Sequence, residues 1–174
     1  MMRILVVSLA LVSTLAAAPQ PNIDKPWAPL SFLLGEWVGK GGGESGQGSG
    51  GFSFELELER NVLVRKNRAD YAATQDRPAY HHEDLMIVYK EPGEDRLRAI
   101  YFDNEGHVIH YAVEPSGDGV RFLSDALPSS PRYRLSYRKL SSDTVALKFE
   151  IAPPGKPEAF STYIEATAQR KPSR

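Results

Sequence analysis

The sequence predicts an all-β protein, an antiparallel up-and-down β-barrel of about ten strands. Apolar and polar residues alternate with a period of two over most of the chain. No segment beyond the first 29 residues shows an apolar stripe with the 3.6-residue period of a helix. Clusters of Gly, Pro, Asn, Asp and Ser separate the alternating segments. An even number of strands would also let the last strand pair with the first, which removes both edges of the sheet.

Composition narrows the class of function. The chain has 174 residues, enough for one domain with a real core. Its net charge of −1 argues against a nucleic-acid binder, which needs a basic stripe to replace counterions. Cysteine is absent, which excludes thiol nucleophiles, Cys-ligated zinc, iron–sulfur clusters and disulfides.

The first 18 residues have the features of a signal peptide. Arg3 supplies a positive charge, Ile4 to Leu15 is apolar, and Ala16-Ala17-Ala18 provides small residues for cleavage. The apolar run of about 12 residues is shorter than the roughly 20 that a membrane-spanning helix needs. We therefore expect cleavage near Ala18, export to the periplasm or secretion, and no transmembrane segment in the mature chain. An uncleaved membrane anchor is the alternative.

The remaining elements follow from turn signals and periodicity. Residues 19–29 contain four prolines and are expected to form an extended leader. Pro29 to Leu34 predicts one short helical turn, ended by Gly35. The barrel domain is expected over 30–170, with a tail at 171–174. The predicted strands are 36–41, 52–59, 62–70, 81–90, 96–103, 107–114, 120–124, 132–140, 144–151 and 159–169.

Three of these strands show the alternation most clearly. Their expected inward residues are Phe52, Phe54, Leu56 and Leu58 in one strand, Tyr133, Leu135 and Tyr137 in the second, and Val145, Leu147, Phe149 and Ile151 in the third. The intervening residues of the second strand include three arginines, which predict a solvated outer face: Arg132, Arg134 and Arg138.

The connections suggest which end of the barrel is open. The expected loops at one end are 42–51, 71–80, 104–106, 125–131 and 152–158, and most of them are long. Those at the other end are shorter: 60–61, 91–95, 115–119 and 141–143. Long loops usually carry function, whereas tight turns only connect strands. The end with the long loops is therefore the predicted mouth.

Residues near the beginning and the end of the predicted barrel sequence carry a family resemblance. Gly35-Glu36-Trp37, after a helical turn and before the first strand, resembles the G-x-W signature of the lipocalin/calycin superfamily. The resemblance implies that Trp37 plugs the closed end and that a basic residue from the last strand covers it. Arg170 has the parity of Ala166 and Ala168 and is placed for that contact, which cation–π stacking would favour.

Within that superfamily, Phe32–Gly43 resembles the opening of nitrobindin-type haem-binding barrels and of exported bacterial calycin-like domains of unknown function. Nitrobindins hold haem iron through a histidine of the final strand. The predicted final strand here has no histidine, and Tyr163, near that position, has outward parity. Haem is thus an alternative cofactor whose expected ligand is absent, and no haem ligand is assigned.

A cluster of titratable residues is predicted at the mouth. In the hairpin of strands 81–90 and 96–103, the numbers of two paired residues are expected to sum to about 186. In the hairpin of strands 96–103 and 107–114, they are expected to sum to about 210. If Leu85 and Ile87 face inward, so do their neighbours of the same parity. The predicted ligand-binding residues are His81, Glu83, Asp103 and His107 at the mouth, above Tyr89, Tyr101 and Tyr111.

Three interpretations of this mouth cluster remain open. Its members are solvated cross-strand pairs, or they orient a bound molecule, or they hold a metal ion or act as acid and base. The leading prediction is non-catalytic binding of a small, largely apolar molecule in the exported compartment. The alternatives are a hydrolase or isomerase, metal-assisted or not, and a nitrobindin-like haem binder. The sequence specifies neither catalytic residues, metal ligands nor an oligomeric state.

Overall fold

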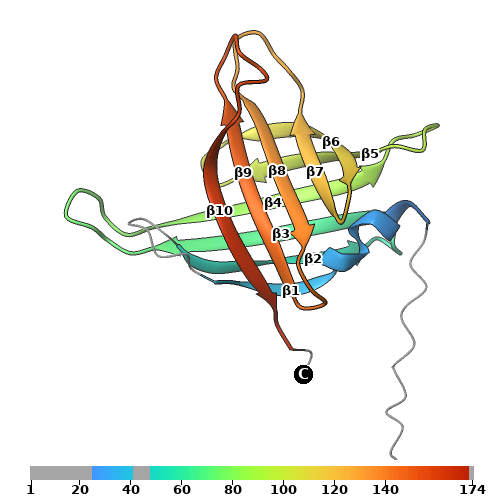
Figure 1. Cartoon of the computed structure of the whole chain (residues 1–174), viewed down its shortest axis with the longest axis horizontal. Coiled ribbons are helices and arrows are strands. Elements are labelled where there is room, and N and C mark those ends of the chain that lie inside the picture. The colour runs from blue at the N-terminus through green and yellow to red at the C-terminus, as the bar shows by residue number, and fades with distance from the viewer. Residues whose placement is uncertain (1–24, 41–47, 173–174) are drawn as a thin grey trace, which may run out of the picture.

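A computed structural model of the chain describes residues 25–40 and 48–172. Within these ranges, ten antiparallel strands form a closed barrel, preceded by one short 3₁₀ helix (Figure 1). Each strand pairs with its neighbours in the chain, and β1 pairs with β10 to close the sheet. The predicted fold class is confirmed.

The elements agree closely with the predicted ranges, since every predicted strand overlaps one observed strand. They are η1 (Lys25–Leu33), β1 (Gly35–Lys40), β2 (Ser49–Glu57), β3 (Val62–Tyr71), β4 (Tyr80–Lys90), β5 (Leu97–Asp103), β6 (Val108–Ser116), β7 (Gly119–Ser124), β8 (Arg132–Lys139), β9 (Thr144–Ala152) and β10 (Ser161–Arg170).

The helix begins earlier than predicted. Lys25 is its first residue, so positions 25–29 of the expected extended leader are helical. The buried side chains Trp27, Leu30 and Leu33 are three residues apart, which is the repeat of a 3₁₀ helix. The predicted signal peptide and the rest of the leader, residues 1–24, lie outside the described residues. No helix in the described part of the chain is long and apolar enough to cross a membrane.

Helix η1 closes one end of the barrel (Figure 1, right). Its three buried side chains belong to the barrel core. The indole of Trp27 donates a hydrogen bond of 2.9 Å to the carbonyl oxygen of Arg60, in the turn between β2 and β3. Trp37, on β1, donates at 2.7 Å to the carbonyl of Leu33. The guanidinium carbon of Arg170 lies 4.3 Å from the centre of the Trp37 ring, which is the contact the resemblance implied.

The turn between β2 and β3 differs from the predicted hairpin. Strand β2 ends at Glu57, and residues 58–61 form the turn. Leu58 was expected to face inward, but it lies in this turn and is 71% exposed. Leu58, Glu59 and Arg60 all have positive φ, and the carbonyl of Leu58 accepts hydrogen bonds from the backbone and side chain of Asn61. The local hydrogen bonds of the turn thus outweigh the alternating pattern.

Aromatic side chains fill the closed half of the barrel. Phe52, Phe54, Phe122 and Tyr137 meet edge to face, with ring centres 5.3 to 6.3 Å apart. This geometry is favourable for aromatic pairs. The predicted inward parities of β8 and β9 hold, because Leu135, Tyr137, Val145, Leu147 and Phe149 belong to or pack against the core.

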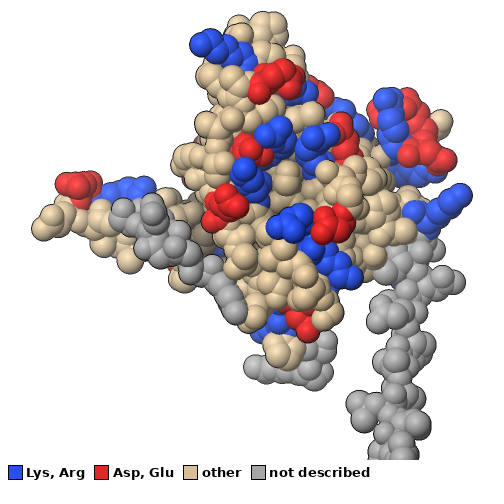
Figure 2. Space-filling model, viewed as in Figure 1, with Lys and Arg blue, Asp and Glu red and all other residues tan. Residues whose placement is uncertain are grey.

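The outer face of β7–β10 carries interleaved charges of both signs (Figure 2). Arg134 forms a two-pronged pair with Glu150 at 2.7 and 2.8 Å, and Arg132 pairs with Glu158. Arg138 is exposed. The predicted arginine row is therefore largely matched by carboxylates, rather than forming a patch of one sign.

Candidate functional site

The open half of the barrel contains a cavity of about 810 Å³. Its lining includes Tyr71, Tyr80, His107 and Tyr163, which lie beside the connections at the predicted mouth. This volume lies within the range of small-molecule sites in proteins. The two sides of the cavity differ in chemistry, since one is polar and the other is apolar.

The polar wall comes from three adjacent strands. Their alternation turns every second side chain toward the lumen. The residues of the polar wall are Arg65 and Asn67 on β3, His82 and Asp84 on β4, and Tyr101 and Asp103 on β5.

Arg65 and Asp84 form a buried ion pair in this wall. Their side chains are 5% and 4% exposed, and Nη1 of Arg65 contacts Oδ1 of Asp84. Nε of Arg65 donates to the hydroxyl of Tyr137 at 2.7 Å, and Asn67 donates to Oδ2 of Asp84 at 2.9 Å. Burial raises the pKa of Tyr137 to about 12, so its hydroxyl stays protonated. These bonds offset the cost of removing two charges from water.

His82 connects the ion pair to the mouth. Its Nε2 lies 3.3 Å from Oδ2 of Asp84 and 3.1 Å from the hydroxyl of Tyr101, while Nδ1 lies 3.0 Å from Oε1 of Glu105. The hydrogen bond with Asp84 is the main cause that raises the pKa of His82 to about 9, against the opposing effect of burial. The imidazole is therefore a cation at neutral pH.

Asp103 stabilises both the polar wall and the turn between β5 and β6. Its Oδ1 accepts hydrogen bonds from the backbone of Glu105 at 3.0 Å and of His107 at 2.9 Å. Its Oδ2 accepts from Tyr101 at 3.2 Å and lies 2.8 Å from Nδ1 of His107. Burial acts to raise the pKa of Asp103, but the bonds from His107 and Glu105 outweigh it and the pKa lies below its ordinary value.

The apolar wall faces these groups across the cavity. Its residues are Ile109 on β6, Tyr133 and Leu135 on β8, Leu147, Phe149 and Ile151 on β9, and Ala166 on β10. Tyr133 stacks on Phe149, with ring centres 5.9 Å apart and planes 5° apart. The cavity therefore has one side made of hydrocarbon and ring surfaces and one side made of hydrogen-bonding groups.

Tyr163 lies at the mouth, although its sequence parity pointed outward. The register of β10 against β9 shifts between Thr162 and Ile164, which indicates a bulge at this position. The Tyr163 ring meets Phe149 edge to face at 6.2 Å and lines the cavity, with 69% of the residue exposed. Phe160, just before β10, has its ring centre 4.0 Å from the guanidinium carbon of Arg134.

The structure brings four of the predicted ligand-binding residues to the cavity: Tyr101, Asp103, His107 and Tyr111. The other three, His81, Glu83 and Tyr89, lie on the outer face of β4 and do not line it. The register explains the difference, because Leu85 pairs with Phe102 rather than with Tyr101. The expected pairing of Tyr101 with Ile109, in the next hairpin, is observed.

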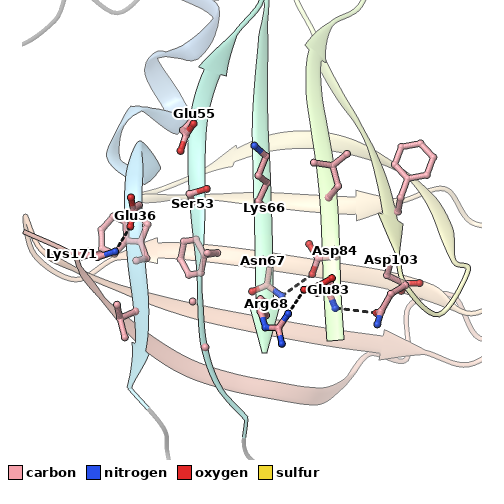
Figure 3. A pocket seen from close by; sticks show the side chains of 18 residues that line it. Glu36, Ser53, Glu55, Lys66, Asn67, Arg68, Glu83, Asp84, Asp103 and Lys171 are labelled. Carbon is pink, nitrogen blue, oxygen red and sulfur yellow. Dashed lines mark hydrogen bonds and ion pairs between the residues drawn. The ribbon is translucent and has the colours of Figure 1, made fainter. Parts of the chain in front are cut away.

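Glu83 belongs instead to a groove on the outer surface of β1–β5 (Figure 3). There it pairs with Arg68 of β3, and its backbone N–H donates to the side chain of Asn104 at 3.0 Å. Arg68 also pairs with Asp70. All three charged side chains are about half exposed, so this outer cluster is a solvated set of pairs.

Sequence reasoning missed Arg65, His82 and Asp84. One signal was available, since Arg65 has the parity of the apolar residue Leu63 and follows it on the same strand. An arginine on the inward face requires a buried acceptor. Asp84, opposite this region on β4, provides the acceptor. An inward Asp84 also implies an inward His82, because residues two apart on a strand face the same side.

The histidine through which nitrobindin-type barrels hold haem iron has no counterpart on the final strand, because β10 contains no histidine. Of the two histidines that line the cavity, His82 has both ring nitrogens within hydrogen-bond distance of neighbouring side chains and is protonated at neutral pH, whereas His107 is bonded through Nδ1 to Asp103. In the described part of the chain, no three His, Asp or Glu side chains are grouped so as to hold a metal ion.

No protein-family model and no curated protein matches the chain. A function therefore has to be inferred from the cavity itself.

Proposed function

We propose that this barrel binds a small, largely apolar molecule in its cavity without transforming it. The observation that carries the proposal is the division of one cavity into an apolar and a polar wall. Binding sites for small molecules usually combine an apolar lining with a few placed polar groups. The apolar wall would supply affinity, at about 25 cal/mol per Å² of buried apolar surface. The polar wall would orient the molecule.

The state of the titratable groups favours binding over catalysis. A general base must offer a free acceptor close to the proton it takes. His82 is already protonated at neutral pH, and both oxygens of Asp103 accept hydrogen bonds from their own turn and wall. These groups are therefore better suited to holding a fixed geometry than to accepting a proton.

The cellular setting of this proposal comes from the sequence. The first 18 residues resemble a signal peptide, and the closed barrel with Arg170 over Trp37 agrees with the calycin-like resemblance. We therefore propose a carrier or scavenger that acts in the periplasm or after secretion.

The test uses N-phenyl-1-naphthylamine, an apolar dye that fluoresces on leaving water, and a matched pair of variants. Ala166→Trp places an indole in the cavity, because Ala166 lines it on β10. Ala146→Trp places the same indole outside the barrel, since Ala146 lies on β9 next to inward Leu147 and pairs with Thr167. We expect the wild-type protein and Ala146→Trp to bind the dye, and Ala166→Trp to bind it at least about tenfold more weakly.

Equal dye binding by both variants would place the dye outside the cavity and contradict the proposal. Hydrolysis of short-chain esters that is lost in Asp103→Asn would instead support the enzyme alternative. A Soret band after addition of haem would support the haem alternative.

A further inference from the structure

We propose that the molecule bound in this cavity is uncharged and that Arg65 holds one of its oxygen atoms, a carbonyl, ester, ether or hydroxyl oxygen. This inference rests on the proposed function and specifies its ligand class. Three observations support it. A hydrogen-bond donor is available, the carboxylate acceptors already have hydrogen-bond partners, and the cations of the polar wall already have carboxylate partners.

Arg65 has one nitrogen that no described residue satisfies. Its Nε donates to Tyr137 and its Nη1 to Asp84, whereas Nη2 has no hydrogen-bond partner among the described residues. Every fully buried side-chain nitrogen or oxygen in the described part of the chain has a partner. Nη2 must therefore be accessible from the cavity that Arg65 lines. A donor held in place and 95% buried as a side chain is poised for an acceptor atom of a ligand.

The hydroxyl of Tyr111 supplements this donor. Tyr111 is 1% exposed, lines the cavity, and makes no hydrogen bond with a described residue. Burial raises the pKa of Tyr111, so its hydroxyl stays protonated and can donate a hydrogen bond. The Tyr111 ring is held edge to face between Tyr101 and Phe122. The cavity thus offers an oxygen-bearing ligand a second donor besides Nη2 of Arg65.

The acceptors of the polar wall are already in use. Asp84 accepts from Arg65 and Asn67 and lies beside His82. Asp103 accepts two backbone and two side-chain hydrogen bonds. An amine or ammonium group, which needs free acceptors, would find neither carboxylate available. The wall therefore selects for molecules that accept hydrogen bonds.

The cations of the wall already have carboxylate partners without a ligand. Arg65 pairs with Asp84, and the protonated His82 lies between Asp84 and Glu105, while Asp103 lies against His107. A carboxylate or phosphate would add a negative charge to a set whose two cations, Arg65 and His82, are already paired with carboxylates. Burial of an uncompensated charge is far more costly than burial of a neutral hydrogen-bonded group. An uncharged oxygen acceptor avoids that cost.

The test compares three probes with the same ten-carbon chain at pH 7.5: 1-decanol, decanoate and decylammonium. Each probe displaces N-phenyl-1-naphthylamine from the wild-type protein, and the displacement gives its Kd. We expect 1-decanol to bind at least about tenfold more tightly than either charged probe. This comparison needs no variant, so it remains decisive if a substitution prevents folding. Equal or tighter binding of decanoate or decylammonium would overturn the inference.

A matched pair of double variants tests the role of Arg65. Arg65→Met/Asp84→Leu removes the inward ion pair, and Arg121→Met/Glu114→Leu removes an outward pair on β6 and β7, neither member of which lines the cavity. We expect the inward variant to bind 1-decanol about tenfold more weakly, with the affinity for the dye retained. The outward variant should behave like wild type. If 1-decanol binds the folded inward variant as tightly as wild type, Arg65 does not hold the ligand oxygen. If no protein binds the dye, the proposed function itself fails.

Discussion

The guanidinium of Arg170 lies over the indole of Trp37, with its carbon atom 4.3 Å from the ring centre, and also connects η1 to the barrel. Its Nη2 donates to the carbonyl of Phe32 at 2.9 Å, and its Nη1 contacts the carbonyl of Leu34. Trp37 in turn donates to the carbonyl of Leu33. The last strand thus satisfies the carbonyl groups at the end of a helix that precedes the first strand. One side chain therefore joins the first strand, the last strand and the helix at the closed end of the barrel.

This relationship predicts that Arg170 contributes more to the free energy of unfolding than its position near the C-terminus suggests. Arg170→Met keeps an aliphatic chain over Trp37 but removes the cation–π contact, the ion pair with Asp143 and three hydrogen bonds to the carbonyl groups of Phe32, Leu34 and Ser142. We expect the free energy of unfolding to fall by about 2 kcal/mol, measured by urea denaturation followed by tryptophan fluorescence. The control is Lys171→Met, the neighbouring residue, which pairs with Glu36 on the exposed surface. A similar small effect of both variants would contradict this role of Arg170.

The buried ion pair predicts a larger effect when only one partner is removed. Asp84→Ala leaves the guanidinium of Arg65 in the lumen without its carboxylate, and we expect a loss of about 3–5 kcal/mol in the free energy of unfolding. The double variant Arg65→Met/Asp84→Leu should recover most of this loss, because no unpaired charge remains. Chemical denaturation of the three proteins measures both effects. If the double variant were no more stable than Asp84→Ala, the cost would come from lost packing rather than from the unpaired charge.

His82 predicts a dependence of stability on pH. Its pKa is raised from 6.5 to about 9 in the folded protein, first by the hydrogen bond with Asp84 and also by that with Glu105, with Tyr101 facing the same ring. Because the folded state binds the proton more tightly, the stabilisation is complete below pH 6.5 and disappears as the pH rises through about 9. With screening of this partly exposed group, we expect wild type to lose about 2 kcal/mol over that window.

The control for this prediction is His82→Gln, which keeps a hydrogen-bonding side chain but does not titrate. Urea unfolding at intervals between pH 6 and pH 10 should show a falling free energy of unfolding for wild type relative to this variant. NMR titration of the His82 ring protons gives the pKa directly. Parallel pH profiles for the two proteins, or a His82 pKa near 6.5, would rule out the proposed linkage.

The hairpin of β5 and β6 shows what could be predicted from the sequence. The short turn at Asn104-Glu105-Gly106 leaves little freedom in the register, and the predicted pairing of Tyr101 with Ile109 is observed. Asp103 fixes this turn through its own hydrogen bonds, so local chemistry and strand alternation agree. The strands follow from such local patterns, whereas the contact of Arg170 with Trp37 was implied by the calycin-like resemblance and is observed.

Strand β4 shows why the candidate site was only half predictable. Apolar residues occupy both of its faces, with Met86 and Val88 inside and Leu85 and Ile87 half-buried outside. Hydrophobicity therefore does not determine the inward face, and the longer turn before β5 allows either register. A slip of one residue exchanges the two faces. The buried pair of Arg65 and Asp84 decides between them, and it is a contact between strands that no single-strand pattern contains.

The turn between β2 and β3 gives a further prediction about stability. Glu59 has φ of 54°, in the left-handed region that side chains other than glycine occupy at a cost of about 1–2 kcal/mol. Glu59→Gly removes that cost but gives the unfolded chain more conformational freedom, so we expect a net gain of about 0.5–1 kcal/mol. The control Glu57→Gly, at the end of β2, should lower stability instead, because glycine weakens a strand. Thermal unfolding by circular dichroism measures both, and a loss of stability in Glu59→Gly would show that the turn does not carry strain at this residue.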